Sequence, residues 1–161
     1  SLDSPQGDVK FAEILTRMGC KLLQPGRGLG VQGPARGLKP VTADLSDLPD
    51  CAQTLAVVAA FAAGESRLEG LSTLRRKETD RVAALIAELA KLGIKAQARG
   101  DTLIVHGGKP KAGAAIDTYD DHRMAMSFAL AGLVVPGVKI KDPGVVSKSF
   151  PKFWEYLARL G

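Results

Sequence analysis

A repeated order of predicted helices and strands constrains the fold of this chain more than any other feature of its sequence. Residues 37–106 are predicted to form a strand, an apolar helix, a strand, an amphipathic helix and a hairpin, in that order. The order starts again at residue 114 and stops after its second helix, and residues 8–32 match the end of an earlier copy. The repeated unit is therefore β-α-β-α-β-β, which predicts an α/β fold built from stacked units.

The two helices of a unit differ in where they carry apolar side chains. Residues 51–63 and 121–133 are apolar on almost every side, which is typical of helices that are buried on most of their surface. Residues 82–92 are apolar along one face and are followed by Gly93 as the stop signal. Stacking the units should bury one helix of each and leave the sheets outside. Because residues 1–161 start inside one unit and stop inside another, closure is expected to need strands that this chain lacks.

The composition fits a globular protein that binds a small acidic ligand. Of the 161 residues, 45% are hydrophobic and 24% are charged, and the formal net charge is +5. Lys and Arg are interleaved with Asp and Glu, there is no basic arm, and only 5% of the residues are aromatic. These properties argue against nucleic-acid binding, whereas a small acidic substrate fits the modest surplus of positive charge.

The cysteines and histidines are too few and too scattered for a metal centre or a disulfide framework. Cys20 and Cys51 are far apart in the sequence and are expected to be buried thiols. His106 ends an apolar strand, and His122 lies in a polar cluster. We therefore predict no metal and no cofactor.

The sequence has no feature of a membrane or secreted protein. No apolar run approaches the roughly 20 residues that a membrane span needs, and no signal peptide is visible. We therefore expect a cytoplasmic location. The first residue is Ser1 rather than Met, so the chain is expected to be a trimmed or excised piece.

Cationic side chains stand at the predicted starts of three helices. Lys77 and Arg81 precede the amphipathic helix, Arg123 opens the second apolar helix, and Lys148 precedes a helix predicted for residues 150–160. Lys77 and Arg81 share a helix face if the helix includes both, because they are four residues apart. One such cluster alone is typical of a solvated face with local ion pairs. Recurrence at equivalent helix starts instead predicts one convergent pocket for a small polyanion.

Two carboxylates are candidates for acid–base chemistry. Asp44 ends a predicted strand just before a buried helix, a place that suits a functional side chain and equally a turn residue. Asp47 and Asp50 take the helix-capping role more easily. Glu78 adjoins Lys77, and a neighbouring cation with partial burial can tune a carboxylate for proton transfer.

Five stretches of the sequence match motifs of one known family. Residues 74–81 are Leu-Arg-Arg-Lys-Glu-Thr-Asp-Arg, residues 119–126 are Tyr-Asp-Asp-His-Arg-Met-Ala-Met, and residues 146–151 are Val-Ser-Lys-Ser-Phe-Pro. Residues 44–50, Asp-Leu-Ser-Asp-Leu-Pro-Asp, and residues 6–8, Gln-Gly-Asp, agree as well. Together, and in the order in which they occur along the chain, these stretches resemble EPSP synthase (3-phosphoshikimate 1-carboxyvinyltransferase).

The resemblance implies a fold and an activity. The family's fold is an inside-out α/β barrel with three β-α-β-α-β-β units in each of two domains, which agrees with the repeat. The implied reaction transfers the enolpyruvyl group from phosphoenolpyruvate to the 5-hydroxyl of shikimate 3-phosphate and releases phosphate. Residues 1–161 would form most of the C-terminal domain: residues 8–32 the tail of one repeat, 37–106 a full repeat and 114–161 a truncated one. Without the N-terminal domain as partner, the chain is expected to be inactive.

The resemblance also implies residue roles. Asp44 would accept the proton of the attacking hydroxyl, Glu78 would exchange a proton with the methylene carbon, and Lys77 would contact both substrates. The residues implied to bind substrate are Asp44, Lys77, Arg81, His122, Arg123 and Lys148. Asp80 is expected to be a helix cap.

Two alternative functions remain open, and two positions of the sequence depart from the family's pattern. The alternatives are a non-catalytic anion-binding module and the related enolpyruvyl transferase that acts on UDP-N-acetylglucosamine. The latter would be expected to carry a reactive Cys in a flexible loop, which neither Cys20 nor Cys51 matches. Thr73 stands near a position where many EPSP synthases have Asn, and Asp47 has no role in the resemblance.

Overall fold

The computed structural model describes residues 9–24, 26, 28–76 and 80–160, and for Arg76 the backbone only. The helices are α1 Val9–Arg17, α2 Ala52–Ala59, α3 Arg81–Lys91, α4 His122–Gly132 and α5 Phe153–Leu157, with short 3-10 helices η1 Pro49–Cys51, η2 Ser72–Arg76 and η3 Pro143–Lys148. The strands are β1 Lys21–Leu23, β2 Gly30–Gln32, β3 Thr42–Asp44, β4 Glu65–Glu69, β5 Lys95–Arg99, β6 Thr102–His106, β7 Ala115–Ile116 and β8 Lys139–Ile140.

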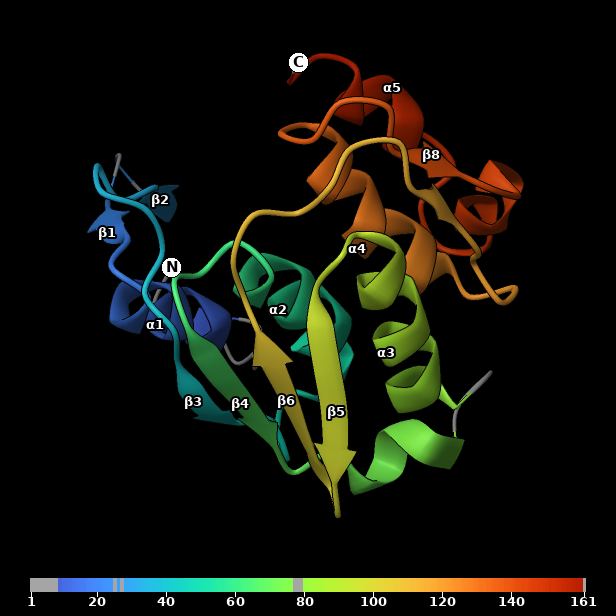
Figure 1. The fold of residues 1–161 in the computed structure, drawn as a ribbon. Coiled ribbons are helices and arrows are strands. Elements are labelled where there is room, and N and C mark those ends of the chain that lie inside the picture. The colour runs from blue at the N-terminus through green and yellow to red at the C-terminus, as the bar shows by residue number, and fades with distance from the viewer. Residues whose placement is uncertain (1–8, 25, 27, 77–79, 161) are drawn as a thin grey trace.

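The predicted unit is visible as the run β3-α2-β4-α3-β5-β6 (Figure 1). Its four strands form one sheet in the order β3-β4-β6-β5, in which β3 and β4 are parallel and β6 is antiparallel to both of its neighbours. The hairpin predicted around residues 100 and 101 pairs Arg99 with Thr102. The partial copies repeat pieces of this pattern: β7 and β8 are parallel across α4, and β1 and β2 form an antiparallel hairpin after α1.

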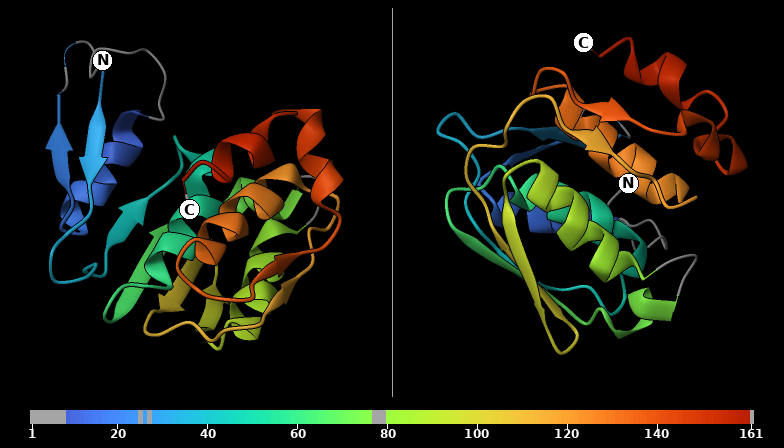
Figure 2. Two further views of the ribbon diagram at one scale, coloured as in Figure 1. Left: turned by 90° about the horizontal axis from the view of Figure 1, so that it is seen from above. Right: turned by 45° about the vertical axis from the view of Figure 1, so that its right-hand side comes forward.

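The apolar helices α2 and α4 pack against each other at the centre, as Figure 2 shows from two sides. The sheet lies outside α2 and α3, which cover one of its faces. In β4, Ser66 and Leu68 are buried, whereas Glu65 and Arg67 are exposed and form an ion pair of 2.7 Å. This alternation is typical of a sheet with one face on a core and one face in water. The expectation of buried helices and outer sheets is therefore confirmed for the complete unit.

Several boundaries differ from the prediction. The helix expected for residues 51–63 begins with the 3-10 turn η1 and ends at Ala59, because Ala62 bridges to Leu38 and the amide of Ala63 donates to the carbonyl of Leu38. The strand expected for residues 37–43 is reduced to that bridge and β3. The cysteines are only half-buried, so the prediction of buried thiols was wrong.

The C-terminal part differs most. The helix predicted for residues 150–160 is shortened to α5, and Lys148 ends η3 instead of standing at the start of a helix. Trp154 donates its indole N–H to the carbonyl of Pro143, which ties α5 to the start of η3. No helix in the described part of the chain is long and apolar enough to cross a membrane.

Candidate functional site

The starts of α3 and α4 are each capped by a carboxylate. Asp80 accepts the backbone amides of Val82 and Ala83 at 3.1 and 3.0 Å, which confirms its predicted capping role. Asp121 accepts the amide of Arg123 at 2.8 Å in the same way. The caps fix where each helix begins and therefore where its first cationic side chain leaves the backbone.

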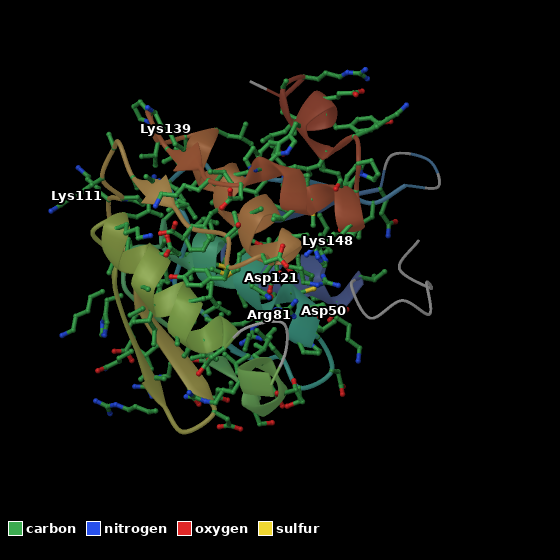
Figure 3. All side chains as sticks on the ribbon, turned by 90° about the vertical axis from the view of Figure 1, so that its right-hand side faces the viewer. Asp50, Arg81, Lys111, Asp121, Lys139 and Lys148 are labelled. Atoms are coloured by element: carbon green, nitrogen blue, oxygen red, sulfur yellow. The ribbon has the colours of Figure 1, made fainter. Side chains whose placement is uncertain are left out.

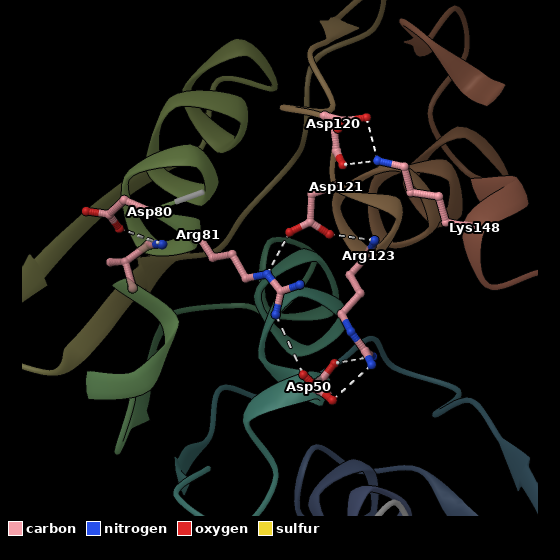
Figure 4. A network of polar contacts seen from close by, with 8 residues as sticks. Asp50, Asp80, Arg81, Asp120, Asp121, Arg123 and Lys148 are labelled. Atoms are coloured by element: carbon pink, nitrogen blue, oxygen red, sulfur yellow. Dashed lines mark hydrogen bonds and ion pairs between the residues drawn. The ribbon is translucent and has the colours of Figure 1, made fainter. Parts of the chain in front are cut away.

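Arg81 and Asp121 join the two helix starts through a buried ion pair. The Arg81 Nε atom donates to Asp121 Oδ2 at 2.6 Å, and the two residues are 1% and 0% exposed. A charge can be buried in this way only when a partner compensates the loss of hydration. The guanidinium also lies 3.6 Å from Asp50 Oδ1 through Nη1, so it stands between carboxylates from two other segments (Figure 4).

Asp50 links Arg81 to Arg123. The Arg123 Nη2 atom donates to Asp50 Oδ2 at 2.9 Å, and Nη1 reaches the Asp50 carbonyl at 3.4 Å. The sequence repeat places Asp50 and Asp121 at equivalent positions, each before the first apolar helix of its unit. Both carboxylates meet the guanidinium of Arg81, so equivalent positions of two units converge on one side chain.

Lys148 approaches the same end of the molecule from η3. Its Nζ atom lies 2.7 Å from Asp120 Oδ1 and 3.3 Å from the Asp120 carbonyl. Figure 3 shows Lys148, Arg81, Asp50 and Asp121 close together at one end of the helices. We call this set of six residues the ion network: Asp50, Arg81, Asp120, Asp121, Arg123 and Lys148.

The ion network has a fixed part and an exposed part. Arg81 and Asp121 are buried, whereas the side chains of Asp50, Asp120 and Lys148 are 46%, 79% and 51% exposed. Exposed ion pairs contribute about 0–1 kcal/mol each, so an incoming anion can replace the carboxylates on the exposed cations at little cost. The buried pair has no such freedom because each charge depends on the other.

Two consecutive residues just before Asp121 have a left-handed backbone. Tyr119 and Asp120 have φ angles of 55° and 54°, in a region that non-glycine residues rarely adopt. The amide of Asp121 donates to the carbonyl of Thr118 at 2.9 Å and closes this turn. Sequence reasoning missed the strain, because neither residue is a glycine that would have indicated it.

Comparison with known proteins identifies the family. A family model described as EPSP synthase (3-phosphoshikimate 1-carboxyvinyltransferase) matches residues 1–157. This chain belongs to the EPSP synthase family. The predicted family resemblance is confirmed.

The relatives are longer than this chain. The 3-phosphoshikimate 1-carboxyvinyltransferase of Syntrophobacter fumaroxidans is 48% identical over 163 residues, which cover 99% of this chain and 38% of that protein. The chloroplastic protein of the same name from Arabidopsis thaliana is 42% identical and is covered to 31%. The chain therefore spans about two fifths or less of the curated relatives it matches.

Solved structures confirm the fold class. An EPSP synthase from Acinetobacter baumannii superposes on 99% of this chain with a TM-score of 0.84 and 30% sequence identity, and 40% of that protein is covered. The enolpyruvyl transferase NikO from Streptomyces tendae superposes with a TM-score of 0.73 at 24% identity, a likeness of fold alone. The expected EPSP synthase-like α/β fold is thus confirmed.

In this chain, the carboxylate candidate Asp44 lies at the end of β3, as predicted. Its Oδ1 atom accepts the Ser46 hydroxyl at 2.6 Å and the Ser46 amide at 2.9 Å. These two hydrogen bonds, the hydroxyl first, hold the pKa of Asp44 below its usual range. A Cβ atom at Gly70 would lie 2.5 Å from this oxygen, so Gly70 keeps the space around Asp44 open.

Other predicted site residues are placed less fully. Lys77 and Glu78 lie outside the described residues, and their roles stay predictions. The helix α3 begins at Arg81, and the prediction that Lys77 and Arg81 share a helix face lies outside the described residues. His122 is the first residue of α4 and is half-buried.

The described residues also form apolar cavities that lie away from the ion network. No group of three or more His, Cys, Asp or Glu side chains in this part of the chain could hold a metal ion. Two apolar cavities, of about 400 and 370 Å³, lie between α4 and α5 and between α4 and α2. None of the network's residues lines either of them.

Proposed function

We propose that this chain supplies the phosphoenolpyruvate-binding part of a 3-phosphoshikimate 1-carboxyvinyltransferase. The observation that supports it most is the meeting of Arg81, Arg123 and Lys148, from three separate segments, in one ion network. Phosphoenolpyruvate carries a carboxylate and a phosphate, and several preorganised cations suit such a ligand. The family membership supplies the reaction class.

Phosphoenolpyruvate would bind by replacing the exposed carboxylates of the ion network. Arg123 would exchange Asp50 for an oxygen of the substrate, and Lys148 would exchange Asp120. Arg81 would stay on Asp121 through Nε, and its Nη1 atom would exchange Asp50 for an oxygen of the substrate. The buried pair would therefore hold one guanidinium in place before the substrate arrives, which lowers the reorganisation needed on binding.

The remaining roles follow the family pattern. A proton added to the methylene carbon, with Glu78 as the proposed donor, makes the neighbouring carbon cationic. The 5-hydroxyl of shikimate 3-phosphate then attacks that carbon and loses its proton to Asp44. The tetrahedral adduct loses phosphate, and the new methyl group returns a proton to the Glu78 carboxylate, which restores the double bond. Lys77 would contact both substrates, and His122 would line the site.

Asp44 in this structure is a weak base, because Ser46 lowers its pKa. Shikimate 3-phosphate would have to remove water or the Ser46 hydroxyl from this carboxylate to raise its basicity. We therefore propose that Asp44 first accepts a hydrogen bond from the substrate and gains its proton only as the new bond forms.

We further propose that the chain acts together with an N-terminal domain and that it is located in the cytoplasm. Shikimate 3-phosphate binding is proposed to need an N-terminal domain as well, because the curated relatives are more than twice as long as this chain. A cytoplasmic location is part of the proposal, and the free thiol of Cys20 fits a reducing compartment.

A chimera tests the proposal. Residues 1–161 replace the matching segment of the Syntrophobacter fumaroxidans protein, and phosphate release is measured with phosphoenolpyruvate and shikimate 3-phosphate. We expect release that depends on both substrates. A chimera that folds but releases no phosphate, beside an active parent enzyme, would contradict the proposed function.

A matched pair of lysine variants tests the site. Lys148→Ala in the chimera should lower kcat/KM for phosphoenolpyruvate about 10- to 100-fold, the range for a lost hydrogen bond between charged groups. Lys139→Ala is the control, because Lys139 is exposed in β8 and lies apart from Lys148 in Figure 3. Equal losses for both variants would show that general surface charge, rather than the ion network, attracts the substrate.

A further inference from the structure

Glu88 is a fully buried carboxylate on α3 that the proposed chemistry does not use. It is 0% exposed and lies seven residues after Arg81 on the same helix. Its Oε1 atom accepts the Tyr119 hydroxyl at 2.7 Å, and its Oε2 atom accepts the backbone amide of Asp117 at 3.0 Å. Lys91 compensates the buried charge at 2.7 Å. A carboxylate with this set of donors is held in one position.

Two of the three Glu88 partners belong to the segment that leads into α4. Asp117 begins this segment, and Tyr119 opens the left-handed turn that ends at the cap Asp121. Asp117 is in turn held by Lys91 at 2.6 Å and by Lys141 at 2.7 Å. The start of the segment is therefore fastened to α3 through both its backbone and its side chains.

The far end of the same segment is fastened to α3 by Arg81. Asp121 accepts the Arg81 Nε atom, so α3 holds the segment at two points, through Arg81 and through Glu88. Between these points lies the left-handed turn, a conformation that persists only where its surroundings over-determine it. Through the Tyr119–Glu88 hydrogen bond, α3 also contacts a side chain of the turn itself.

The chemistry of Tyr119 suits this role. Burial, and then the adjacent Glu88 carboxylate, raise the pKa of Tyr119 to about 12. The phenol therefore stays protonated, and remains a donor to Glu88, throughout the neutral range. Tyr119 is 39% exposed as a residue, so its hydroxyl contributes more than hydrophobic burial to fixing its place.

We infer that Glu88 and Tyr119 are positioning residues that set the left-handed turn, and through it the places of Asp121, Arg123 and Asp120, for phosphoenolpyruvate binding. The inference rests on the proposed function for its substrate. Neither residue needs to touch that substrate. Their effect passes through Asp120, which Lys148 contacts, and Asp121, which caps α4 and holds Arg81.

Tyr119→Phe in the chimera tests the inference, because it removes one oxygen and leaves Glu88 with Lys91 and the Asp117 amide. We expect KM for phosphoenolpyruvate to rise about tenfold, as for the loss of a hydrogen bond to a charged group, with a smaller change in KM for shikimate 3-phosphate. Tyr156→Phe is the matched control, because Tyr156 lies in α5 and is 49% exposed.

Hydrogen exchange supplies a second measurement that does not depend on turnover. Tyr119→Phe should speed exchange of the Asp121 and Arg123 amides about tenfold and leave the β5–β6 amides unchanged, whereas Tyr156→Phe should change neither set. Unchanged exchange at Asp121 and Arg123 would overturn the inference, whether or not the chimera is active.

The outcomes separate the two proposals. An inactive unsubstituted chimera would refute the proposed function, and the exchange measurement would still decide whether Tyr119 holds the turn. An active chimera in which Tyr119→Phe raises both KM values equally, or lowers only the thermal midpoint, would overturn the inference and leave the proposed function standing.

Discussion

At the scale of single residues, the most informative side chain is Arg81. The sequence presents it as one of several charges in a polar stretch, whereas the structure buries it between Asp121 and Asp50. Burial makes its charge dependent on those partners and fixes its direction. A stretch that is typical of a solvated surface thus contains a buried arginine that connects separate parts of the fold.

This dependence predicts a large effect of Asp121→Ala on stability. The substitution removes the carboxylate that lies 2.6 Å from the buried Arg81 guanidinium, and with it the cap of α4. We expect the free energy of unfolding to fall by about 3–5 kcal/mol, as for breaking a buried ion pair, measured by urea denaturation of the chimera.

Asp47→Ala is the control for this prediction. Asp47 has an 85% exposed side chain, and it lies 3.7 Å from Lys10 in an exposed ion pair. It should change stability by less than about 0.5 kcal/mol. Similar losses for the two variants would contradict the special role of the buried pair.

The hydrogen bonds to Asp44 predict that the Ser46 hydroxyl alone affects how the stability of the protein depends on pH. Ser46→Ala removes the stronger of the two hydrogen bonds, so the pKa of Asp44 should rise toward its ordinary value near 3.9. A carboxyl whose folded-state pKa is lowered adds stability above its unfolded pKa, and this stability is lost as the pH falls through the folded pKa. The variant should therefore lose stability relative to the parent at neutral pH and converge with it in acid.

The measurement is an NMR titration of the Asp44 carboxyl, with Ser72→Ala as control because Ser72 is an exposed residue of η2. An Asp44 titration that is the same in the parent and in Ser46→Ala would show that the hydroxyl does not set the pKa of this carboxyl.

At the scale of elements, Gly70, which directly follows β4, leaves space for the side chains of Ser46 and Asp44. Gly70 has a φ of +74°, and a Cβ atom there would lie 2.2 Å from Ser46 Oγ and 2.8 Å from the Ser46 amide. A side chain at this position would therefore push apart the loops that follow β3 and β4, in addition to straining the backbone.

Gly70→Ala should destabilise the protein by about 2–5 kcal/mol, the sum of left-handed strain and overpacking. Gly100→Ala separates the two causes, because Gly100 has a φ of +59° with nothing within 4 Å of an added Cβ atom. It should cost about 1–2 kcal/mol. Thermal unfolding of both variants in the chimera measures the difference, and equal losses would mean that the contact with Ser46 is unimportant.

Elements also show how well local patterns predict structure. The hairpin of β5 and β6 forms between the predicted residues, because its alternation and its turn are encoded within a few positions. The helix predicted for residues 51–63 ends early at Ala59, because Ala62 and Ala63 bond to the distant Leu38. Such a contact with a distant strand segment leaves no local signal.

At the scale of the whole molecule, α2 and α4 are the shared centre of the complete and partial units. Thr54 and Ser127, on these two helices, are hydrogen-bonded at 3.0 Å in a region that is otherwise rich in alanine. The same packing brings together the starts of the helices and therefore the ion network. The position of the site is a consequence of how the units stack.

A whole-molecule prediction follows for the chain alone. Residues 1–161 should release no phosphate from phosphoenolpyruvate and shikimate 3-phosphate under conditions in which the chimera is active, because the proposed shikimate 3-phosphate site needs the other domain. The phosphate assay that is used for the chimera measures this directly. Turnover by the chain alone would show that one domain suffices.

The sequence by itself determined the repeating unit, the two buried helices, the cap Asp80 and the family. These features depend on periodicity and on motifs, which are properties of neighbouring residues. Only the tertiary structure decided that Arg81 is buried on Asp121, that Asp50 joins Arg81 to Arg123, and that Glu88 holds Tyr119. The partners in these contacts are 31 to 73 residues apart, so their meeting depends on how helices pack. Charge pairing between distant helix starts leaves no periodic trace in a sequence, and the site is therefore decided by packing.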